Sequence, residues 1–138
     1  MATYTKFQPF VEALAHGEHD FSSHQLAVAL SNTAPTAASD DHLDDITEIS
    51  YTNLSGSNPR NITTSASAQS GGTYALELAD LTLTASGAVG PFQYVIIYND
   101  DHASDALIGY YDYGSAVELD SGDTFKIDFS ATGLFTLA

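Results

Sequence analysis

FQYVIIY, at residues 92–98, is the stretch that decides the fold of this 138-residue chain. Successive side chains of an extended strand point to opposite faces, and here both faces carry aromatic or β-branched residues. A strand that is apolar on both faces is typical of the centre of a packed sheet. A second apolar stretch, LIGYYDY at residues 107–113, follows an acidic loop at residues 99–105. The sequence therefore predicts two neighbouring strands at the centre of a β structure.

Outside this pair, short apolar stretches alternate with clusters of Gly, Ser, Asn, Asp and Pro, which form turns. DSGD, at residues 120–123, has the composition of a hairpin turn, and the loop at residues 52–60 is expected to be the most flexible. Many short strands separated by turns predict a single all-β domain over residues 25–138, a β-sandwich or jelly-roll-like fold. The other strands are expected at residues 25–30, 46–51, 62–68, 73–78, 81–84, 116–119, 124–129 and 134–137.

The N-terminal segment has a different period. Four apolar residues follow the spacing i, i+3, i+4, i+7, which places them on one face of a helix. They are Phe7, Phe10, Val11 and Leu14. Pro9 suits the first turn of a helix and Gly17 its end, so a short amphipathic helix is expected over residues 6–16. We expect residues 1–24 to form a helical anchor that lies on the sheet or against a neighbouring subunit.

The charge of the chain limits its partners. There are 18 acidic residues against three basic ones, Lys6, Arg60 and Lys126, which gives a formal net charge of −15 at pH 7. Binding to DNA or RNA needs clustered Lys and Arg to neutralise phosphates, so no nucleic-acid partner is expected. Binding to an anionic membrane is disfavoured by the same sign of charge. The absence of cysteine excludes disulfides and thiolate chemistry.

Some residues could carry metal chemistry. His16 and His19 are three positions apart, but the predicted helix ends at Gly17 between them, which favours surface histidines over a metal pair. Two acidic stretches, at residues 40–45 and 99–105, offer oxygen ligands without the spacing of a calcium loop. We interpret them as solvated loops, with a cation that bridges the two as the alternative. No nucleophile elbow, P-loop or dinucleotide motif occurs. No catalytic residues, no cofactor and no metal site are therefore predicted.

Eight tyrosines and no tryptophan give the aromatic residues an unusual composition. Tyrosine is enriched at protein interfaces because it combines a rigid apolar ring with a polar tip. Most of the tyrosines are expected to pack between strands, with one or two at a subunit contact. The candidate interface residues are Tyr4, Phe7, Phe10, Val11, Leu14, Tyr110, Tyr111 and Tyr113.

Six stretches of the sequence are distinctive: MATYTKF at residues 1–7, FVEALAHG at 10–17, LAVALSNTAP at 26–35, DITEI at 45–49, GPFQYVIIYND at 90–100 and LIGYYDYGS at 107–115. In these stretches the chain resembles a group of small tailed-phage virion proteins, the capsid decoration or cement proteins, and the likeness extends over nearly the whole chain. The resemblance implies a structural protein that is assembled in the host cytoplasm, binds the major capsid protein on the outer surface of the head and stabilises the shell.

The symmetry of a capsid lattice favours a homo-oligomer at such a site, and a trimer first. No catalytic residues come with the resemblance. The alternative role is a tail or fibre module that binds a host glycan through exposed tyrosines.

Overall fold

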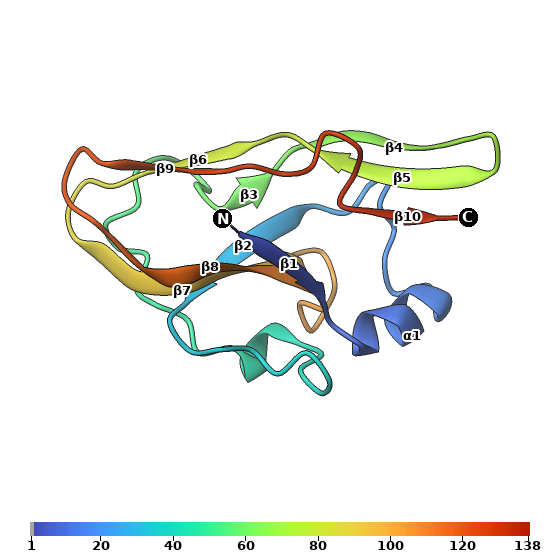
Figure 1. The fold of residues 1–138 in the computed structure, drawn as a ribbon, viewed down its shortest axis with the longest axis horizontal. Helices are drawn as coiled ribbons and strands as arrows, with labels where there is room; N and C mark the ends of the chain where they lie inside the picture. Colours follow the sequence, from blue (N-terminus) through green and yellow to red (C-terminus); the bar gives the residue numbers. More distant parts are fainter. Residues whose placement is uncertain (1) are drawn as a thin grey trace.

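The computed structural model describes residues 2–138 and places them in three antiparallel sheets with one α-helix, α1 (Pro9–Ala15), and one 3-10 turn, η1 (Leu43–Asp45) (Figure 1). Strands hold 47% of the residues and helices 7%. The predicted all-β class with one short helix is confirmed. The strands are β1 (Thr3–Lys6), β2 (Leu26–Ser31), β3 (Asn61–Ile62), β4 (Thr64–Ser70), β5 (Thr73–Leu78), β6 (Leu81–Thr84), β7 (Val89–Asn99), β8 (Leu107–Leu119), β9 (Thr124–Ile127) and β10 (Phe135–Leu137).

The main sheet has five strands in the order β1-β8-β7-β2-β3. Its central strand, β7, contains the stretch from which the fold was predicted, and Ile97 pairs with Val28 on one side and with Gly109 on the other. Val95, Ile96 and Ile97 are all fully buried, as a strand that is apolar on both faces requires. β8 continues through the two segments that were predicted as separate strands at residues 107–113 and 116–119.

The second layer is built from a three-stranded sheet, β10-β5-β4, and a two-stranded sheet, β6-β9. Figure 1 shows these two sheets side by side above the main sheet, an arrangement of two packed layers. The sheets have five, three and two strands, so the jelly-roll form of the prediction is not confirmed. The turn at residues 120–123 connects β8 in one layer to β9 in the other, so it is not the hairpin turn that its composition predicts.

The edge of β2 beyond β3 is covered by irregular chain. β3 pairs only with Leu26 and Ala27, and further along β2 the Leu30 N–H donates to the Tyr51 hydroxyl at 2.9 Å. The Arg60 guanidinium donates to the Val28 carbonyl at 2.9 Å. Two backbone groups also pair with this edge, since the Val28 N–H donates to the Arg60 carbonyl at 2.9 Å and the Ile49 N–H donates to the Leu30 carbonyl at 3.0 Å. Side chains and single backbone groups of irregular chain therefore supply partners that a paired strand would otherwise supply. Residues 46–51 form no regular strand, so the strand predicted there is wrong.

The N-terminal segment is part of the domain rather than a separate anchor. β1 pairs with β8 at the edge of the main sheet, and the Phe7 N–H continues this pairing with the Ile108 carbonyl at 3.2 Å. α1 therefore begins only at Pro9, later than the predicted start at residue 6. Because Phe7 lies before the helix, Val11 does not share a helical face with it and points to solvent instead.

Candidate functional site

The structure places the eight candidate interface residues in different environments. Phe7, Phe10 and Tyr111 belong to the core of the chain itself, with exposed fractions of 0%, 4% and 8%. Side chains that are already buried in the chain offer little surface to a partner, so these three are weaker candidates for an interface than the other five. The half-buried members are Tyr4, Leu14, Tyr110 and Tyr113, and Val11 is the exposed one.

The tyrosines pack mainly against other aromatic rings. The Tyr4 and Tyr111 ring centroids are 5.2 Å apart, and those of Tyr113 and Phe125 are 5.1 Å apart. Burial raises the pKa of Tyr113 to about 12. These contacts confirm the prediction that most tyrosines pack between strands.

Apolar side chains reach the surface at one end of the molecule, beside α1 and β10. Val11 and Leu137 are 53% and 46% exposed, the two large hydrophobic residues with high exposure among residues 2–138. Leu14, one turn after Val11, lines a shallow groove together with Tyr74 and Leu137. We call Val11, Leu14, Tyr74 and Leu137 the α1–β10 patch; Figure 1 shows α1 below the end of β10.

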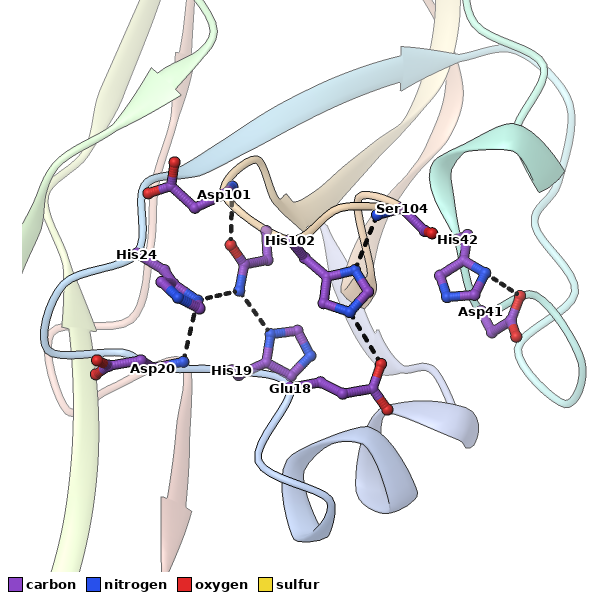
Figure 2. A network of polar contacts seen from close by, with 10 residues as sticks. Glu18, His19, Asp20, His24, Asp41, His42, Asp101, His102 and Ser104 are labelled. Carbon is purple, nitrogen blue, oxygen red and sulfur yellow. Dashed lines mark hydrogen bonds and ion pairs between the residues drawn. The ribbon is translucent and has the colours of Figure 1, made fainter.

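A cluster of histidines lies beside the C-terminal end of α1 (Figure 2), and one of its members, His19, also lines the groove of the α1–β10 patch. We define the histidine cluster as Glu18, His19, His24, Asp41, His42, Asn99 and His102. They come from the segment between α1 and β2, from the loop before η1, and from the end of β7 with the loop that follows it. Backbone hydrogen bonds hold the last two loops together, from the Leu43 N–H to the Asp105 carbonyl at 3.0 Å and from the Leu107 N–H to the Asp41 carbonyl at 2.9 Å.

The side-chain amide of Asn99 determines which ring nitrogen carries the proton in two neutral histidines, His19 and His24. Its Oδ1 accepts a hydrogen bond from the Asp101 N–H at 3.1 Å, so its Nδ2 group is the donor toward the rings. The Nδ2 atom lies 3.0 Å from His19 Nδ1 and 2.8 Å from His24 Nδ1. Each Nδ1 must then be an acceptor, which leaves the proton of each neutral ring on Nε2.

His19 is the most constrained member of the cluster. It is 8% exposed, stacks on Phe21 with ring centroids 5.2 Å apart, and its Nε2 has no hydrogen-bond partner among residues 2–138. Burial lowers the pKa of His19 to about 4, and the nearby His102 acts in the same direction. At neutral pH this imidazole is therefore uncharged.

The remaining members contact carboxylates. His102 Nε2 lies 3.0 Å from Glu18 Oε1, and His42 Nδ1 lies 3.1 Å from Asp41 Oδ1. The rings of His42 and His102 stack, with centroids 5.9 Å apart and planes 13° apart. Ligand atoms of Glu18, His42 and His102 all lie within 4.8 Å of one another.

Sequence reasoning found this cluster only in part. It paired His16 with His19, but His16 is an exposed residue at the end of α1 and lies outside the cluster. Each acidic stretch contains one histidine, His42 or His102, and these two histidines were the pattern in the sequence that could have indicated the cluster. A contact between the two acidic loops was considered only as a bridge through a cation, whereas direct backbone hydrogen bonds join them.

A polar hollow lies beside the covered edge of β2. Tyr51, Arg60, Tyr98 and Asp100 are among the residues that line it. The Arg60 guanidinium carbon lies 3.9 Å from the Tyr51 ring centroid, and the Arg60 Nη1 donates to the Tyr98 hydroxyl at 3.2 Å. The guanidinium therefore covers the Tyr51 ring on one face.

Comparisons of the chain with protein-family models, with curated proteins and with solved structures gave no match. Among residues 2–138 no helix has the length and apolar character needed to cross a membrane.

Proposed function

We propose that this protein is a structural protein that binds other protein surfaces, as a decoration protein on the outside of a phage capsid. The α1–β10 patch carries the proposal, because it presents apolar side chains on an otherwise acidic surface. Contiguous apolar patches that stay exposed on a folded domain are typical of contact sites. The partner would be the major capsid protein, as the resemblance of the sequence implies.

The charge of the chain suits this role. A formal net charge of −15 keeps the free protein dispersed through mutual repulsion. The same charge favours a partner surface with basic groups and speeds the encounter with it. Adhesion would then depend on the patch, and solubility on the carboxylates around it.

The α1–β10 patch is rigidly attached to the core of the domain. Phe10 packs beneath α1 against Phe135 of β10, with ring centroids 5.4 Å apart, so the helix and the strand are joined through the core. Both elements of the patch are therefore fixed relative to the two layers. A rigid patch loses little conformational entropy on binding.

Self-association is part of the proposal. β1 and β10 lie at the edges of their sheets, where backbone groups can pair with another chain. Capsid lattices have three-fold and two-fold axes, and a trimer on a three-fold axis is the assembly that we propose first.

The alternative, binding of a host glycan, has weaker support. Sugars stack on an open aromatic face, but in the polar hollow the Tyr51 ring lies under Arg60 and Tyr98 is only 3% exposed. The tyrosines of β8 pack against other rings rather than line a groove.

Co-sedimentation with undecorated phage heads tests the proposal. We expect the wild-type protein to pellet with the heads at a fixed stoichiometry, and Val11→Asp combined with Leu137→Asp to remain in the supernatant. Ser121→Asp, in the exposed turn after β8, adds a charge away from the patch and is the control. Wild-type protein that stays in the supernatant, or a double variant that pellets like the wild type, would contradict the proposal. Light scattering of the free protein measures the oligomeric state.

A further inference from the structure

We propose that Glu18, His42 and His102 bind one divalent transition-metal ion such as Zn²⁺. A tetrahedral ion held at about 2.0–2.1 Å from its ligands separates them by about 3.4 Å. The three ligand atoms already lie within 4.8 Å of one another, and the His102 to Glu18 contact is 3.0 Å. Small rotations of the side chains therefore bring all three to one ion. The site is independent of the capsid role.

The site is held in place before any ion arrives. The loops of His42 and His102 are joined by backbone hydrogen bonds on both sides of the isolated bridge between His42 and Ala106. The side chains of Glu18, His42 and His102 are 33%, 34% and 18% exposed, so packing restricts their rotation. Ligands that are already close together lose little freedom on binding.

Asp41 completes the arrangement around His42. Its Oδ1 lies 3.1 Å from His42 Nδ1, and a neutral His42 ring that binds an ion at Nε2 carries its proton on Nδ1, facing this carboxylate. The His42 Nε2 lone pair is then free to bind an ion. Carboxylates on the outer nitrogen of a ligating histidine are common in metal sites, where they orient the ring and increase its basicity.

His102 must change partners when an ion binds. Its Nε2 proton now lies toward Glu18, and its Nδ1 accepts from the Ser104 N–H at 3.1 Å. An ion at Nε2 replaces that proton, and the neutral ring then carries its proton on Nδ1, facing the Ser104 N–H. Ser104 lies in an exposed part of the loop, where water can take over as the partner of its amide. The Ser104 amide therefore moves when the ion binds.

The ligand set selects the class of ion. Two imidazoles and one carboxylate suit Zn²⁺ and its neighbours, whereas Ca²⁺ and Mg²⁺ prefer oxygen ligands alone. A hollow of about 370 Å³, lined in part by Glu12, opens onto two of the ligands, Glu18 and His42. This hollow leaves room for a water molecule as the fourth ligand of a tetrahedral ion.

Calorimetric titration of the EDTA-treated, untagged protein with ZnCl₂ tests the site. We expect one ion per chain, and an affinity at least about 100-fold lower in His42→Gln, His102→Gln and Glu18→Gln. Asp41→Asn, which changes the partner of His42 and leaves the three ligands in place, is expected to lower the affinity by about 10–100-fold. His16→Gln removes an exposed histidine outside the cluster and is the matched control, with unchanged affinity.

Two spectroscopic readouts accompany the titration. Co²⁺ should give the visible absorption of a four-coordinate ion in the wild type and not in His42→Gln, and the Ser104 amide should be among the most shifted in NMR spectra recorded with Zn²⁺. Near-UV circular dichroism in EDTA checks that each variant is folded. Absence of stoichiometric binding in the wild type, or equal binding by folded His42→Gln and His102→Gln variants, would overturn the proposal.

Discussion

Substitution of Tyr51 by Phe tests whether side chains replace strand pairing at the edge of β2. The Tyr51 hydroxyl accepts from the Leu30 N–H at 2.9 Å and donates to Glu48 Oε1 at 2.7 Å. Leu30 is fully buried, so its N–H loses a hydrogen bond inside the protein when the hydroxyl is removed. The ring remains in place under Arg60, so packing changes little.

The size of the effect follows from these contacts. A buried N–H without a partner destabilises the folded state by about 1–3 kcal/mol. The loss of the bond to Glu48 adds less, because that side chain is 30% exposed and water can replace the hydroxyl. We therefore expect Tyr51→Phe to lower the free energy of unfolding by about 2–3 kcal/mol.

Urea unfolding followed by circular dichroism measures the change. The midpoint should fall while the slope with urea concentration stays the same. Tyr94→Phe is the control, because the Tyr94 hydroxyl makes only a long contact of 3.4 Å with Gln93 Nε2. We expect the control to change stability by less than about 0.5 kcal/mol. If Tyr51→Phe behaves like the control, the hydroxyl does not act as the partner of Leu30.

Three further outcomes are expected. A Cβ at Gly109 would collide with the Tyr4 ring, so Gly109→Ala should loosen β1 and speed amide hydrogen exchange in residues 3–6. Leu83→Ala empties a fully buried site and should lower the free energy of unfolding by about 2–5 kcal/mol in urea titrations. The Phe129 N–H and then Lys126 lower the pKa of Asp80 below its ordinary 3.8, so the ionised carboxylate stabilises the fold above that pH. The stability gap between wild type and Asp80→Asn should therefore shrink as the pH falls through the lower folded-state pKa.

Strands with strong apolar patterns could be predicted from the sequence. β2, β5, β6, β7 and β9 lie close to the expected ranges because their alternation or continuous apolar character allows few other structures. β1 was missed because Thr3–Lys6 has no distinctive pattern, and its pairing with β8 depends on the close fit of Tyr4 over Gly109. Contacts of that kind join residues far apart in the chain.

The histidine cluster could not be predicted in full from the sequence, because it too depends on contacts between distant segments. Four of its residues lie in two short loops whose local sequence is typical of solvated turns. Their proximity depends on the hydrogen bonds between the two loops and on the turn that follows α1. Neither contact is encoded in local spacing.

By itself, the sequence determined the all-β class, the central position of β7 and the strongly acidic character of the protein, because periodicity and charge are local or additive properties of the chain. The tertiary structure decided which N-terminal hydrophobes are buried and which are exposed. It also placed Glu18, His42 and His102 together from three separate segments. The reason is physical: burial and ligand geometry depend on how distant segments pack, and that packing is a property of the whole folded chain.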